Sequence, residues 1–80
     1  MTGEYTEVAV IDDPDGLSAR ITRRKNKNGL QQYSFCFFRR YEHAGQDKET
    51  GWMDPRHIPA VVRLTSAVDD RLKLERVRAA

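Results

Sequence analysis

The cysteine and histidine residues of this 80-residue chain, which could supply a nucleophile and its base or bind a metal, are few and widely spaced. Cys36 is the only cysteine, and the two histidines are His43 and His57. A nucleophilic thiol needs a base within hydrogen-bond reach, and nothing in this spacing brings the three residues together. A structural zinc site needs four ligands, and this set supplies three. We therefore expect no catalytic residue, no metal site and no cofactor.

Two other signatures of enzymes are also missing from the sequence. The carboxylates are scattered over predicted turns and a predicted helix, so no pair of acids is indicated for acid–base chemistry. No glycine-rich phosphate-binding loop of the Walker or dinucleotide type is present. The sequence predicts a protein that is not an enzyme and that has no small-molecule substrate.

Positive charge is concentrated in one part of the chain. Residues 1–16 carry five acids and no base, residues 17–41 carry seven bases and no acid, and residues 42–80 carry seven of each. Single-stranded nucleic acid binds to positive surfaces on which its bases stack against aromatic rings. The predicted binding residues are Arg20, Arg24, Lys25, Lys27, Phe38 and Arg40. The alternative is that the acidic first strand lies beside the basic second strand and neutralises it.

These residues are positioned by four predicted strands, over about 5–12, 17–25, 30–42 and 48–53. Asp13-Pro14-Asp15-Gly16 and the Asn28-Gly29 pair mark the first two turns, and residues 43–48 are predicted to form a hairpin loop. A helix is predicted over about 55–75, with residues 76–80 frayed and residues 1–4 a short free end. The chain is therefore expected to be one α+β domain, a curved four-stranded antiparallel meander followed by one C-terminal helix.

The alternation of side chains assigns two faces to this sheet. Leu17, Ala19 and Ile21 share one face of the second strand, which is typical of a strand that is solvated on its other side. Tyr33, Phe35 and Phe37 have the matching parity in the third strand, so we expect them to pack in the core under the helix. Phe38 has the opposite parity and is predicted to lie on the solvent-facing side, beside the basic residues.

The start of the helix has two possible positions. Asp54-Pro55 places an acid at the cap and a proline at the first helical position. Pro59 would then remove a backbone hydrogen bond from the helix. The sequence thus indicates either a tight first turn over 55–58 or a helix that begins near Pro59.

This layout resembles the PC4-like and Pur-alpha-like proteins, which bind single-stranded DNA or RNA and commonly dimerise. More locally, Lys27-Asn28-Gly29, Tyr33-Ser34, Arg40-Tyr41 and Ile58-Pro59 resemble the pattern of a widespread group of small uncharacterised microbial proteins. The resemblance covers about residues 17–72. It implies a two-fold dimer whose sheet surfaces contact nucleic acid, a role that falls by position on the six predicted binding residues.

The size of the chain also favours a dimer, because a domain this small buries little surface and has no disulfide to support it. No apolar signal peptide or membrane segment is visible, so a cytoplasmic location without membrane contact is expected. The competing hypothesis is a protein-interaction or assembly module with no role in nucleic-acid binding. It gains if Arg20, Arg24 and Arg40 pair with Glu7 or with other acids.

Overall fold

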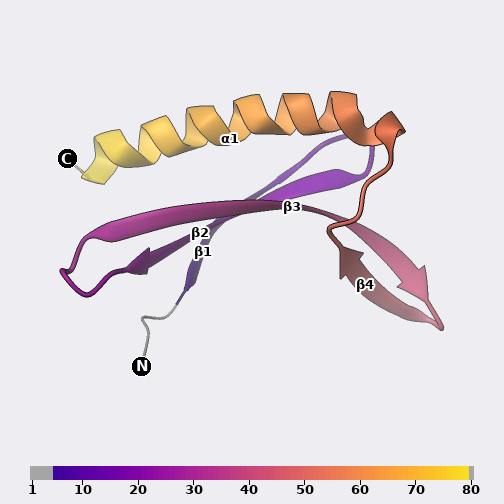
Figure 1. Ribbon diagram of the computed structural model, residues 1–80, viewed down its shortest axis with the longest axis horizontal. Coiled ribbons are helices and arrows are strands. Elements are labelled where there is room, and N and C mark those ends of the chain that lie inside the picture. Colours follow the sequence, from indigo (N-terminus) through magenta and orange to yellow (C-terminus); the bar gives the residue numbers. More distant parts are fainter. Residues whose placement is uncertain (1–4, 80) are drawn as a thin grey trace.

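The computed structural model describes residues 5–79, with side chains up to residue 76. Four strands form one antiparallel sheet in the order β1-β2-β3-β4, and a single helix follows (Figure 1). The elements are β1 (Thr6–Asp12), β2 (Leu17–Lys25), β3 (Gln31–His43), β4 (Gln46–Thr50), the 3-10 turn η1 (Pro55–His57) and α1 (Ile58–Ala79). This confirms the predicted α+β meander with one C-terminal helix. The predicted free end at 1–4 lies outside the described residues.

The β3–β4 connection is tighter than the sequence suggested. The predicted loop over 43–48 is a two-residue turn in which Ala44 and Gly45 have φ angles of 53° and 76°. Two residues with positive φ form the turn that matches the natural twist of a hairpin. The fourth strand is therefore Gln46–Thr50 rather than 48–53, and Trp52 lies in the loop beyond it.

The helix begins in the first of the two predicted ways, with a tight turn after Asp54. Asp54 caps the tight turn η1: its side chain accepts a hydrogen bond from the Arg56 amide, and His57 Nδ1 accepts one from the Asp54 amide. This reciprocal cap satisfies donors that a helix start leaves unpaired. Pro59 then falls in the first turn of α1, where its missing N–H removes no helical bond. The helix continues to Ala79, beyond the predicted end at residue 75.

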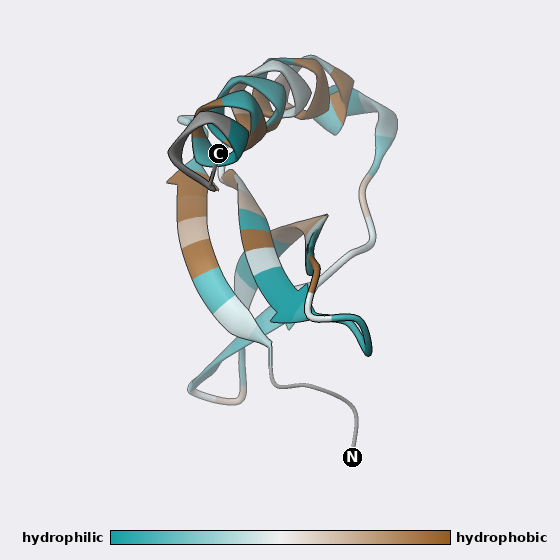
Figure 2. Cartoon of the chain, turned by 90° about the vertical axis from the view of Figure 1, so that its left-hand side faces the viewer, coloured by the Kyte–Doolittle hydropathy of each residue, from teal (hydrophilic) through white to brown (hydrophobic). Residues whose placement is uncertain are grey.

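The core lies between α1 and the middle of β2. Leu17, Ala19 and Ile21 are fully buried, as their alternation predicted, and they meet Ala60, Leu64 and Val68 of the helix. Alternating hydrophobic and hydrophilic bands along the strands beneath α1 mark the two faces (Figure 2).

The prediction for the aromatic residues of β3 is only partly right. Tyr33 and Phe37 are half-buried and pack against this core, but Phe35 is 49% exposed. The predicted core position of Phe35 is wrong because α1 covers β2 more closely than it covers β3. The parity of a strand residue identifies its face, whereas the lateral position of the helix decides which residues on that face are covered.

An ion pair joins the first turn to the helix. Arg63 Nε donates to Asp13 Oδ1 at 2.9 Å, and its terminal nitrogen donates to Asp13 Oδ2 at 2.9 Å and to Asp15 Oδ2 at 2.7 Å. The hydrogen bonds from Arg63 lower the pKa of Asp13 to about 2, and Asp13 and Asp15 together raise the pKa of Arg63. This contact fixes one end of α1 over the β1–β2 hairpin.

Candidate nucleic-acid interface

The structure divides the six predicted binding residues into two groups at different places on the sheet. Arg20, Phe38 and Arg40 lie near the middle of the sheet, on the face away from α1, as predicted from their parity. Arg24, Lys25 and Lys27 lie at the end of the β2–β3 hairpin. The two groups have different surroundings and are described separately.

The first group forms the Phe38 cluster, which consists of Phe38, Arg20, Arg40 and Glu49. The Arg20 guanidinium carbon lies 4.3 Å from the centre of the Phe38 ring, and that of Arg40 lies 5.4 Å from it. Both distances fall within the range of cation–π contacts. Phe38 is only 4% exposed as a result. The predicted solvent exposure of Phe38 is therefore wrong, because two arginines cover the ring and leave no open face on which a base could stack.

The positive charge of the Phe38 cluster is largely neutralised. Arg20 donates two hydrogen bonds to Glu49, at 3.1 and 2.9 Å, and Arg20 Nε donates to Glu7 at 3.1 Å. Arg20 lowers the pKa of Glu49, and Glu49 in turn raises the pKa of Arg20. Arg40 Nε lies 3.8 Å from Glu49. Glu7 was expected as a partner from the acidic first strand, but Glu49 reaches Arg20 from β4 across β3, which the sequence order did not indicate.

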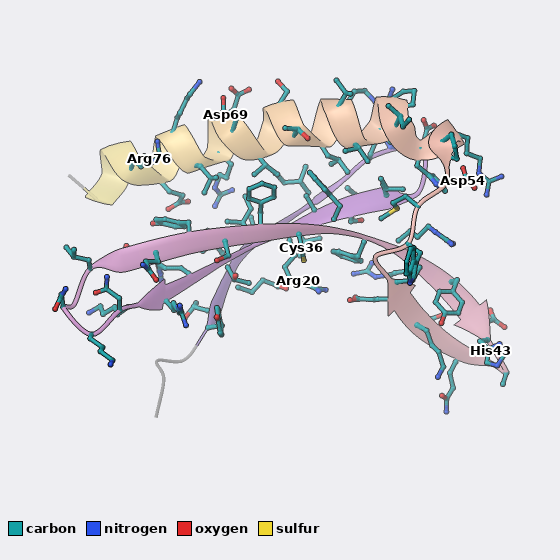
Figure 3. All side chains as sticks on the ribbon, viewed as in Figure 1. Arg20, Cys36, His43, Asp54, Asp69 and Arg76 are labelled. Atoms are coloured by element: carbon teal, nitrogen blue, oxygen red, sulfur yellow. The ribbon has the colours of Figure 1, made fainter. Side chains whose placement is uncertain are left out.

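The second group forms the basic end of the molecule. It contains Arg23, Arg24, Lys25, Lys27 and Arg76. Within residues 5–76, none of these five side chains forms a salt bridge. Arg76 belongs to this group because the last turns of α1 lie above the β2–β3 hairpin. Its side chain lines a shallow groove together with Gly29, Leu30 and Gln31. Figure 3 labels Arg76 at this end of the helix.

An aromatic ring adjoins the basic end. The Arg24 guanidinium carbon lies 5.4 Å from the centre of the Tyr5 ring, and Tyr5 is 61% exposed. Sequence reasoning missed Tyr5, Arg23 and Arg76 as candidates. Tyr5 and Arg23 could have been found, since Tyr5 precedes the strand that pairs beside β2 and Arg23 adjoins Arg24. Arg76 depends on the course of the helix across the sheet, which the sequence does not reveal.

The three residues first considered for chemistry lie apart. Cys36 is exposed in the middle of β3, and His43 is at the far tip of the β3–β4 hairpin (Figure 3). His57 is in the cap of α1. Among the described residues, no three His, Cys, Asp or Glu side chains gather closely enough to hold a metal ion. Nor does any helix in that part of the chain combine the length and apolarity needed to cross a membrane.

The comparisons with known proteins identify no family for this chain. No protein-family model, curated protein or solved structure matches it. The resemblance to PC4-like and Pur-alpha-like proteins therefore stays a prediction from the sequence.

Proposed function

We propose that this protein binds single-stranded nucleic acid, DNA or RNA, in a sequence-tolerant manner through its basic end rather than through the middle of its sheet. The observation that carries this proposal is the absence of acidic partners for Arg23, Arg24, Lys25, Lys27 and Arg76 within residues 5–76. Cations without protein partners are available to release counterions from phosphates, which is the main source of sequence-independent affinity.

The basic end also offers a place for a base. Tyr5 is 61% exposed, with Arg24 over its ring, so part of its aromatic surface is available to a base. Stacking on one aromatic ring beside a positive surface suits a single strand, because the bases of a duplex are already stacked. We place this activity in the cytoplasm, where an exposed thiol such as Cys36 stays reduced.

The test is fluorescence anisotropy of a labelled oligo-dT of about 20 nucleotides, a length that spans at least one typical site. The wild-type protein should bind the single strand more tightly than a duplex of the same length. Its affinity should fall with salt, with a log–log slope of about −0.7 for each phosphate neutralised. Lys25→Ala with Lys27→Ala should make the slope shallower by about 0.7 for each lysine that contacts a phosphate.

The matched control is Lys48→Ala with Arg56→Ala, which removes two exposed cations away from the basic end. The control should bind as the wild type does, because the net charge changes equally but the proposed site does not. Equal weakening by both double variants would show that only net charge matters and would reject the site. No binding by the wild-type protein at low salt would reject the function.

A second candidate function is a protein-assembly module. The pairing of Arg20 with Glu49 and Glu7 favours it, since these acids make Arg20 less available to a polyanion. This candidate predicts no oligonucleotide binding at any salt concentration, so the same titration separates the two functions.

A further inference from the structure

Along one side of β3, none of the described strands pairs with nearly half of its length. β2 pairs with β3 from Gln31 to Arg39, whereas β4 pairs only with Arg39 to His43. Gly51, just after β4, lies beside the carbonyl of Phe37. Residues 31–36 therefore form an open edge on the β4 side, where no described strand pairs with them.

The backbone groups on this open edge can be assigned from the turn. His43 and Gln46 flank a two-residue turn, and such turns close with a hydrogen-bonded pair. Because hydrogen-bonding direction alternates along a strand, the odd-numbered residues of β3 direct their N–H and C=O groups to this side. Tyr33 and Phe35 thus direct backbone groups to the open edge, where no strand in residues 5–79 pairs with them.

The open edge has none of the protection found on the other strand edges. β1 carries Glu7, Asp12 and an irregular register near Val8, and β4 is short and carries charged residues at 47–49. Charges and bulges of this kind discourage pairing with another chain. The open edge, by contrast, contains no charge, no proline and no bulge. Its residues are Gln31, Gln32, Tyr33, Ser34, Phe35 and Cys36.

An apolar groove runs beside the same edge, on the side of the sheet that faces α1. It has a volume of about 520 Å³ and lies between Phe35 and the helix residues Val61, Val62 and Leu72. Phe35 is 49% exposed and Val62 is 62% exposed. An unpaired strand edge and an exposed apolar surface are thus contiguous, which is typical of an interface.

We propose that a second copy of this chain occupies the open edge, by antiparallel pairing of β3 with β3 about a two-fold axis. Two copies of an uncharged edge can pair without charge repulsion. A charged partner strand would find no opposite charge on this edge with which to pair. The end of β4 and Gly51 limit the overlap to a short stretch centred near Tyr33, which leaves room for the turn of the incoming hairpin. The result is a continuous eight-stranded sheet with the Phe35 side chains and both apolar grooves at its centre.

The second copy would also supply the burial that a single chain lacks. The side chains of the core are Leu17, Ala19, Ile21, Ala60, Leu64 and Val68, two of which are alanines. A domain of this size buries a small fraction of its surface and commonly gains stability from a second subunit.

This inference does not depend on nucleic-acid binding, because neither the open edge nor the apolar groove includes the lysines of the basic end.

The test is the molar mass in solution, measured by sedimentation over a range of protein concentrations. The wild-type protein should have twice the chain mass of 9.3 kDa. Tyr33→Pro removes an outward-facing N–H, a position at which edge strands tolerate proline, and should raise the dimer Kd at least about tenfold. Phe35→Lys places a charge at the same edge without changing the backbone and should have the same effect.

Leu74→Lys is the control, since Leu74 is 45% exposed on α1 but does not line the groove. It should leave the dimer intact. Circular dichroism verifies that each variant is folded, and Phe35→Lys decides the matter if Tyr33→Pro does not fold. A wild-type protein that is monomeric at about 100 μM, or a dimer that survives both folded edge variants, would overturn the proposal.

Discussion

The Phe38 cluster and the basic end contain the same kinds of residue but differ in what surrounds them. In the Phe38 cluster, Arg20 and Arg40 lie over one ring and share Glu49. At the basic end, Lys25 and Lys27 have no acidic partner within residues 5–76. The difference shows that the sequence gives the number of cations in a basic stretch. The strands that pair beside this stretch decide which of those cations are available to a ligand.

The same difference separates residues that stabilise the fold from residues that we propose for binding. A cation that stacks on a buried ring and pairs with a carboxylate stabilises the fold. Such a cation could bind a ligand only after these contacts were broken. A cation without such contacts loses only its own side-chain freedom when a ligand binds. We therefore assign the Phe38 cluster to stability and the basic end to recognition, and the following predictions test that assignment.

The largest effect is expected from Phe38→Ala. The variant removes a ring that is 4% exposed and leaves Arg20 and Arg40 over a cavity, so the free energy of unfolding should fall by ~3 kcal/mol. Urea denaturation measures this change. Trp52→Ala is the control, because Trp52 is 83% exposed and its truncation should alter stability by less than about 0.5 kcal/mol. Equal stability of the two variants would return Phe38 to the list of binding residues.

A smaller effect is expected from acid, through the ion pair of Asp13 with Arg63. The pKa of Asp13 is about 2 in the folded protein, below its ordinary value of 3.8. A carboxyl with a lowered pKa stabilises the fold above its unfolded pKa, and this contribution is lost as the pH falls from about 4 to about 2. Thermal midpoints measured across this range should therefore decrease, and those of Asp13→Asn should decrease less.

The basic end provides the contrast for this pH dependence. Lys25→Ala with Lys27→Ala removes cations that have no carboxylate partner among the described residues, so it should leave the slope of the thermal midpoint between pH 4 and 2 unchanged. A shallower slope in the lysine variant would show that these lysines have acidic partners in solution. It would also contradict their assignment to recognition.

The fold was predictable because its signals are local. The alternation at Leu17–Ile21, the Asn28-Gly29 turn and the Asp54-Pro55 cap each depend on a few adjacent residues, and each appears in the structure. The predicted bounds failed at the β3–β4 turn, since Ala44 adopts a positive φ that alanine rarely takes. No local pattern marks such a residue.

The site was less predictable because it depends on lateral contacts between strands. Parity placed Phe38 on the correct face, but its burial depends on Arg20 from β2 and Arg40 from β3 meeting over the ring. Glu49 reaches Arg20 over 29 positions of sequence. The open edge of β3 arises because β4 is shorter than β3 by eight residues, 13 against 5. Such differences in strand length and register become visible only when the sheet is assembled.

The smallest effect, and the one that bears most directly on the comparison, is expected from Glu49→Gln. The variant removes the negative charge that Arg20 and Arg40 share but keeps a side chain of the same shape, so the Phe38 cluster should gain free positive charge. The ion pairs are partly exposed, so the loss of stability should be at most about 1 kcal/mol. Arg40 should then be able to contact a phosphate.

The measurement for Glu49→Gln is the salt dependence of oligo-dT binding. The log–log slope should become steeper by at most about 0.7, because one further cation can release counterions. Asp47→Asn is the control, since it removes a charge from the same strand at a residue that has no salt bridge among those described. If only Glu49→Gln steepens the slope, then Glu49 separates the two regions by neutralising one of them. If neither variant changes it, the covered ring rather than the shared carboxylate keeps nucleic acid away from the middle of the sheet.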